Sequence, residues 1–358
     1  MTNLHLPTLL GALAPTTRTY RDYAQPLWRR LLFSREAAII AALLIVIVVA
    51  SLSVRSFSKP ITVTYLLLDI APILLIALPM TLIIITGEID LSVASIVGLS
   101  SVTLGVLHQG GMPIEGAAVV ALVAGALAGA LNGFLITVVG LPSLAVTIGT
   151  LALYRGLAVG LLGTKAVTEF TEFWTDLAKS KIGATAIPSV VIVIVVLAII
   201  FGLLLHFTTF GRGVYAIGLS PEAARFSGIR VERTKFVLFM LSGIVAALAG
   251  IYYTLRFGSA RGDNATGLEL SVIAAVLLGG VSIFGGRGSL IGPLAGAVLI
   301  GILASALRLA NVTSDVINII TGALLIASVV GTSLLAWLRT KRSRTRRSKP
   351  ENLAVTKG

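Results

Sequence analysis

The sequence TTFGRGVYAIGLSPEAARFSGIRVERTK, residues 208–235, is the polar stretch around which the rest of the chain is organised. It lies between two long apolar runs and carries five Lys or Arg and two Glu. Charged side chains at this density are too costly to remain in the hydrocarbon core of a bilayer. The stretch is therefore expected in water, between two membrane spans.

A short helix is expected inside this stretch. Ser220 is a residue type that caps helix N-termini, Pro221 suits the first helical position, and Glu222 in the first turn interacts favourably with the helix dipole. The helix should end near Gly228. A structured basic helix on the aqueous face of a membrane protein indicates contact with another molecule.

The composition predicts an all-α integral membrane protein. Of 358 residues, 56% are hydrophobic and only 12% are charged, and the mean hydropathy is +1.00. This is more apolar surface than one soluble core can hide. A spanning helix needs about 20 apolar residues, so about ten transmembrane helices are expected. They are placed at residues 37–54, 61–85, 93–108, 114–139, 143–162, 188–206, 236–257, 268–283, 290–309 and 313–338.

The chain divides into a cytoplasmic lead at residues 1–36, a transmembrane domain at 37–338 and a basic tail at 339–358. With both termini and the loop 208–235 inside, 19 Lys or Arg lie in cytoplasmic segments and 8 on the other side. This asymmetry predicts that orientation. The net charge of +13 comes largely from the tail, which is expected to bind anionic membrane lipid and not nucleic acid.

Two spans and one interruption have unusual sequences. The span at 61–85 contains Asp69, Pro72 and Pro79 and is expected to be kinked or broken. The span at 114–139 places small residues at every fourth position, which favours close helix packing. Those residues are Gly125, Gly129 and Gly133. Residues 163–187 form an amphipathic interruption with three Lys and three acids.

No catalytic, metal-binding or cofactor-binding motif is found. The chain has no cysteine, and His5, His108 and His206 are too scattered for a metal site. A G-x-x-x-x-G-K-[ST] phosphate loop is missing, so nucleotide hydrolysis by this chain is not expected. The run Gly285-Gly286-Arg287-Gly288-Ser289 lacks the lysine of a phosphate loop and is interpreted as a tight turn between helices.

Three motifs resemble one family of membrane proteins. Glu222-Ala223-Ala224 followed by Gly228 is similar to the EAA-x-x-x-G loop of importer-type ABC permeases. The run Gly87-Glu88-Ile89-Asp90-Leu91-Ser92-Val93 resembles the G-x-I-D-L-S-V signature of the ribose-type sugar permeases within that group. A third block, AAVLLGGVS at residues 274–282 with GGRGS at 285–289 and Gly292, also resembles theirs. The resemblance covers about residues 35–340; it departs at Glu88, where well-known members carry glycine, and in the long basic lead and tail.

The resemblance implies a permease subunit of an ATP-driven importer for a sugar or sugar-like solute in the bacterial inner membrane. ATP would be hydrolysed by separate ABC subunits, a periplasmic binding protein would deliver the solute, and a second permease copy or a related permease would complete the pore. The coupling helix that docks on the ATPase would comprise Ser220, Pro221, Glu222, Ala223, Ala224, Arg225 and Gly228. Structural turns are assigned to Gly87, Gly279, Gly280, Gly285, Gly286 and Gly288.

Other polar residues leave two interpretations open. Asp69, Glu88, Asp90 and Ser92 are candidates for the solute pathway. Asp90 and Glu88 are also suited to capping the N-terminus of the next span. Asp69 is also suited to a hydrogen bond between helices, with Arg155 as a candidate partner. The outer turn with Arg261, Asp263 and Asn264 is either a contact for the binding protein or a plain polar loop.

Two other functions remain as alternatives to the importer. An ion-coupled secondary transporter would need acids or histidines in the middle of spans, for which only Asp69 and Glu269 are near candidates. A membrane scaffold without transport activity is the third. The structured loop at 208–235 favours the importer over the secondary transporter.

Overall fold

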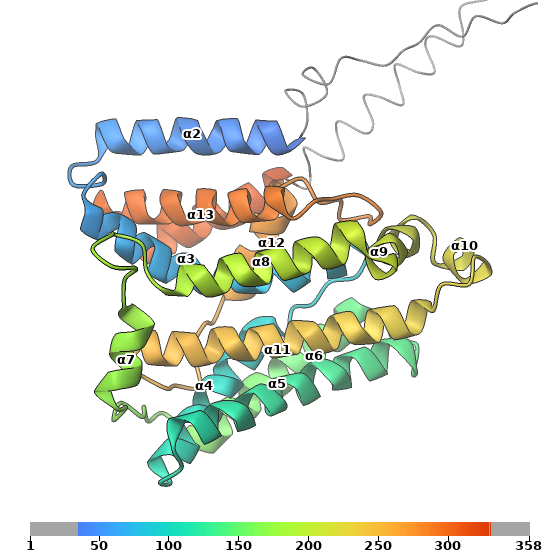
Figure 1. Ribbon diagram of the computed structural model, residues 1–358, viewed down its shortest axis with the longest axis horizontal. Helices are drawn as coiled ribbons and strands as arrows, with labels where there is room; N and C mark the ends of the chain where they lie inside the picture. Colours follow the sequence, from blue (N-terminus) through green and yellow to red (C-terminus); the bar gives the residue numbers. More distant parts are fainter. Residues whose placement is uncertain (1–34, 329, 331–358) are drawn as a thin grey trace, which may run out of the picture.

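The computed structural model describes residues 35–328 and 330, and Figure 1 shows this part as one helical bundle. The all-α class expected from composition is confirmed for these residues, in which only two isolated bridges pair extended segments. The basic tail at 339–358 and all but the end of the lead lie outside the described residues. The helices are α2 (Arg35–Ser53), α3 (Pro60–Ile85), α4 (Val93–Gln109), α5 (Ile114–Thr137), α6 (Ser143–Leu162), α7 (Glu172–Lys179), α8 (Val190–Phe207), α9 (Thr209–Leu219), α10 (Pro221–Phe226), α11 (Val231–Phe257), α12 (Leu268–Leu278), α13 (Ile291–Leu309) and a last helix, Ser314–Ser328.

Six helices of the described part are long and apolar enough to cross a membrane: α3, α5, α6, α8, α11 and α13. The other four expected spans coincide with shorter apolar helices, which are Ala37–Ser53, α4, α12 and Ser314–Ser328. α12 ends at Leu278, five residues before the expected end, because the Gly279–Gly280 turn follows it. α11 begins at Val231, five residues early, and so takes the polar residues VERTK into its first turns.

α3 lies at the centre of the bundle and is one continuous helix. Of the two outcomes expected from its prolines, a kink or a break, the break is therefore wrong. Proline lacks an N–H group, and Pro72 therefore leaves the carbonyl of Leu68 without its helical partner. The hydroxyl of Tyr252 on α11 donates a hydrogen bond to that carbonyl at 3.0 Å. Packing on all sides and this replacement bond keep the helix intact.

α5 and α11 approach closely along the glycine face expected in α5. A Cβ atom added at Gly129 would overlap the carbonyl oxygen of Phe239, and one added at Gly125 would contact Ala247. Gly243 on α11 lies directly opposite this face, and a Cβ there would overlap the carbonyl oxygen of Gly125. The close packing predicted from the glycine spacing is confirmed, and it depends on a glycine from each helix.

Short helices lie at opposite ends of the bundle. In Figure 1 the long helices run roughly along one direction, with α7 at one end and α9 and α10 at the other. α7 is the helical part of the interruption expected at 163–187. α9 was not expected, although Thr208, whose hydroxyl accepts a hydrogen bond from the Gly211 N–H at 3.1 Å, is a recognisable N-cap.

Candidate functional site

The polar loop (residues 208–235) folds into two helices that protrude from the bundle. The hydroxyl of Ser220 accepts a hydrogen bond from the N–H of Ala223 at 3.3 Å, which caps α10 as expected. α10 spans Pro221–Phe226, and Gly228 follows it with a φ of 81°. That left-handed conformation favours glycine and turns the chain back towards α11.

One face of α10 is attached to the bundle and the other is open. Ala224 is buried and packs with Ile217 and Val231. Phe226 and Leu219 are 93% and 70% exposed, although both are large and apolar. Neither Phe226 nor Leu219, which is the last residue of α9, is predicted from the sequence as a site residue; their apolar character within a loop of charged residues was the available signal. Exposed apolar residues grouped with acidic Glu222 form a surface suited to protein contact.

The glycine turn at residues 285–289 and the end of α3, which directly precedes the motif at 87–93, meet α9 at the base of this loop. The N–H of Gly286 donates a hydrogen bond to the Ile85 carbonyl at the end of α3, at 2.8 Å. Gly218 of α9 is so close to both groups that a Cβ atom there would overlap the Ile85 oxygen and the Gly286 nitrogen. The hydroxyl of Tyr215 donates to the Gly288 carbonyl at 2.7 Å. The loop is therefore held directly against the end of the central helix.

Five of the six glycines expected at turns have a positive φ, among them Gly288 with a φ of 159°. Gly87, Gly280, Gly285 and Gly286 have φ values between 71° and 88°. Gly279 has an ordinary φ, and it is required for space, since a Cβ there would overlap the backbone of Gly292 and Pro293 at the start of α13. The turn is thus shaped by backbone contacts.

One ion pair joins α10 to α11, and a second joins α11 to the turn between α3 and α4. Arg225 of α10 pairs with Glu232 in the first turn of α11, and Lys235 pairs with Glu88 in the turn between α3 and α4. All four side chains line one cavity of about 320 Å³. The Lys235–Glu88 pair is shielded, with side chains 15% and 17% exposed, so water and salt screen it less than the Arg225–Glu232 pair.

Asp90 and Ser92 are fully buried and join four helices. Asp90 accepts hydrogen bonds from the Ser92 hydroxyl at 2.7 Å and from the Ser242 hydroxyl of α11 at 2.9 Å. Asn132 of α5 donates to the Ser92 oxygen at 2.8 Å, and Tyr154 of α6 donates to the Asn132 side chain. Burial raises the pKa of Asp90, while the hydrogen bonds from Ser92 and Ser242 lower it. In this conformation the geometry assigns these side chains to helix assembly.

Asp69 lies apart from this region, on α3 towards the α7 end of the bundle. Its carboxylate is near Arg256 and Arg308, at 3.5 and 3.4 Å, and is 36% exposed. Arg155, the partner considered from sequence, is instead occupied by backbone carbonyls, among them those of Gly262 and Asn264 at 2.7 and 2.8 Å. The two positions are separated because Arg155 lies on α6, which packs against α4 and α5.

The three candidate residues of the outer turn do not all lie on its exposed surface. Arg261 and Asp263 are exposed and form an ion pair at 2.9 Å, and the hydrogen bond from Arg261 lowers the pKa of Asp263. Asn264 points inward and donates to the Ser101 hydroxyl at 2.9 Å. The turn is joined to the segment before α7 by paired backbone hydrogen bonds between Val167 and Ala260. Arg261, Asp263 and α7 therefore belong to one exposed surface.

No group of three or more His, Cys, Asp or Glu side chains that could hold a metal ion occurs in the described part of the chain. A protruding helix pair is anchored to the central helix and to α11, which crosses the whole bundle.

Comparison with known proteins places this geometry in context. Residues 62–329 match the family model described as "Branched-chain amino acid transport system / permease component". The "Autoinducer 2 import system permease protein LsrD" of Salmonella typhimurium is 35% identical over 329 residues, which covers 88% of this chain and 98% of the relative. The protein of the same name from Photorhabdus luminescens is 37% identical over 286 residues, covering 77% and 85% of the two chains. No solved structure is significantly similar to the chain.

Proposed function

Because the chain belongs to the family of branched-chain amino acid transport system permease components, and is accordingly a multi-pass permease subunit of the bacterial inner membrane, we propose the partners and the solute with which it works. The partners are ABC subunits that hydrolyse ATP, a periplasmic binding protein and a second permease, either another copy or a related chain. The solute is autoinducer 2 or a similar small furanose-like compound, since the relatives are named for its import.

The geometry of the polar loop supports the proposal that α10 docks on an ATP-hydrolysing subunit. α10 exposes Glu222 and Phe226 and is held at its back by Ala224 and by the Arg225–Glu232 pair. A helix presented in this way can receive a displacement and pass it to α11 and to the end of α3. Such rigid-body transmission is a known means of switching a membrane protein between two states.

The membrane arrangement follows the charge asymmetry of the sequence. We propose ten spans, with both termini and α10 in the cytoplasm and α7 with the 258–264 turn in the periplasm, where Arg261 and Asp263 would meet the binding protein. Support comes from the opposite positions of α7 and α10 in the bundle (Figure 1).

Single-cysteine labelling tests this orientation cleanly, because the chain has no cysteine of its own. Asp176→Cys in α7 should react with a membrane-impermeant maleimide added to spheroplasts. Ser227→Cys at the end of α10 should react only in inverted vesicles. The unsubstituted chain is the control for background labelling, and reaction of Ser227→Cys in intact spheroplasts would contradict the orientation.

Of the four pathway candidates, we propose Asp69 and Glu88 as residues that the solute passes. Both carboxylates are partly accessible, and the charge of Asp69 at membrane depth is costly unless it faces protein or water. Asp90 and Ser92, which are buried, would position the helices around the path.

Transport measurements in vesicles test the function. The permease, reconstituted with its ATPase and second permease and supplied with binding protein loaded with autoinducer 2, should accumulate the solute only when ATP is present. Ribose and a polyol serve as comparison solutes. An ion-coupled transporter would instead accumulate solute from a proton or sodium gradient without ATP. Its coupling candidate Glu269 lies in the first turn of α12 and not in mid-span.

A further inference from the structure

We propose that the cavity between α9 and the start of α11 binds a phosphoryl group, presented either by an anionic phospholipid of the cytoplasmic leaflet or by a soluble phosphate compound. The cavity has a volume of about 530 Å³ and is separate from the one lined by Glu88 and Lys235. Its lining consists of Thr209, Phe210, Gly213, Gly228, Ile229, Arg230, Arg233, Thr234 and Val237.

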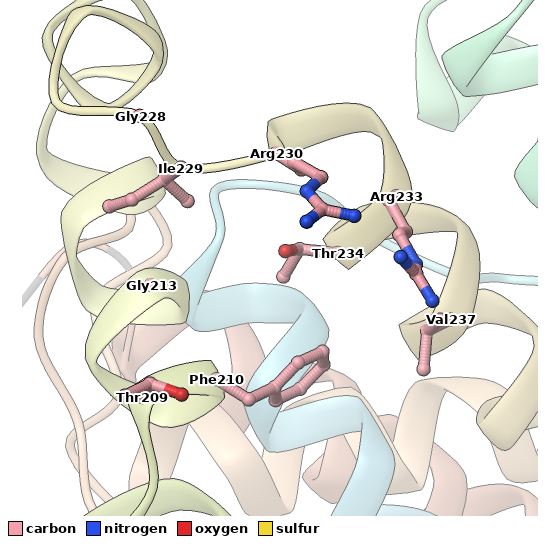
Figure 2. A pocket seen from close by; sticks show the side chains of 9 residues that line it. All are labelled: Thr209, Phe210, Gly213, Gly228, Ile229, Arg230, Arg233, Thr234 and Val237. Atoms are coloured by element: carbon pink, nitrogen blue, oxygen red, sulfur yellow. The ribbon is translucent and has the colours of Figure 1, made fainter.

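Two arginines give this cavity its chemical character. Figure 2 shows the guanidinium group of Arg230 above Phe210 with the Thr234 hydroxyl beside it, and the guanidinium group of Arg233 pointing down towards Val237 at another part of the lining. Arg230 is the residue that immediately precedes α11, and Arg233 lies in the first turn of that helix. A guanidinium group offers several N–H donors in a planar fork that matches the oxygens of a phosphate.

Neither arginine has an acidic partner among the described residues. Glu232, which lies between them in sequence, pairs with Arg225 on the other side of the loop, and the nearby Lys235 pairs with Glu88. The lining therefore contains two positive charges and no acid. Both charges also lie at the start of α11, where the helix dipole is unfavourable to cations. A bound anion would offset both effects.

The floor of the cavity favours a lipid as the source of the phosphoryl group. Phe210 and Val237 provide apolar surface below the arginines, and Ile229 provides it to one side (Figure 2). The site lies where α8 ends and α11 begins, and Phe207 at the end of α8 is 77% exposed. In the proposed orientation this is the level of the cytoplasmic headgroups. Basic pockets at this level between helices bind anionic headgroups in other membrane proteins.

A ligand here would act on the polar loop. Gly228 and Ile229, which follow α10, form part of the wall. Ile229 also packs with the buried cluster of Ile217, Ala224 and Val231, through which α10 contacts the bundle. Occupancy of the cavity would therefore fix the angle at which α10 leaves the bundle.

Binding to the complete transporter in nanodiscs tests the proposal. Phosphatidylglycerol added to phosphatidylcholine discs should raise the thermal unfolding midpoint and remain on the permease in native mass spectrometry. Arg230→Gln/Arg233→Gln should weaken this saturable effect at least about tenfold. Arg230→Lys/Arg233→Lys, which keeps the charge, should retain part of it. Arg212→Gln is the matched control, since Arg212 is exposed on α9 and does not line the cavity.

Inorganic phosphate, titrated in discs of phosphatidylcholine alone, separates the two sources. An effect of phosphatidylglycerol without one of phosphate identifies the lipid headgroup, and an arginine-dependent effect of phosphate identifies a soluble ligand. Equal responses of the double glutamine variant and the wild type would overturn the proposal. So would loss of ATPase assembly in that variant with unchanged phosphoryl binding, because the arginines would then belong to the subunit interface.

Discussion

Glu222→Lys should abolish ATP-driven uptake, with a loss of more than about tenfold, while the permease still inserts and folds. The side chain of Glu222 is exposed on α10 and makes no hydrogen bond or ion pair within the described residues, so its replacement costs this chain only the favourable interaction with the helix dipole, about 0.3–1 kcal/mol. A reversed charge at a protein interface costs several kcal/mol because an attractive contact becomes a repulsive one. Uptake in vesicles and the unfolding midpoint of the purified permease measure the two effects separately.

Two further variants sharpen this prediction. Glu115→Lys makes the same change in the first turn of α5, which is an exposed acid away from the polar loop, and uptake should be nearly normal. Gly228→Asp should also abolish uptake, because a φ of 81° strains any residue with a side chain and shifts α10. Normal transport by Glu222→Lys would show that α10 is a solvated connector and not a docking helix.

Gly243→Val should cause the largest loss of folded protein. A Cβ atom at this position would overlap the carbonyl oxygen of Gly125 and contact the backbone of Gly129. These are backbone atoms and cannot move aside, so α5 and α11 would have to separate. Overpacking of this kind costs about 1–3 kcal/mol and occasionally more. We expect at least about a tenfold drop in folded permease, measured by fluorescence-detected size exclusion after extraction.

Gly149→Val is the matched control for helix separation. Gly149 also lies inside an apolar spanning helix, α6, and a Cβ added there meets no atom within 4 Å. Both variants carry the same change in helix propensity, so any difference between them reports the contact between α5 and α11. Equal yields of the two variants would contradict a requirement for this close approach.

The sequence determined the class of the protein and the local structure of its polar loop. Hydropathy sets helical spans because a bilayer leaves backbone groups no other partner than their own helix. The cap at Ser220, the turn at Gly228 and the glycine face of α5 were readable because they depend on neighbours within a few residues. The expected start of α11 and the expected end of α12 were each wrong by five residues, since apolar content alone does not locate a helix boundary.

Contacts between residues distant in sequence were decided only by the tertiary structure. The Tyr252 hydroxyl that keeps α3 intact at Pro72 lies on another helix. The Lys235–Glu88 pair and the cavity below Arg230 and Arg233 likewise join segments whose separation along the chain reveals nothing about their distance in space. The reason is physical: composition and local pattern decide which segments become helices, whereas interlocking of their surfaces decides which helices meet.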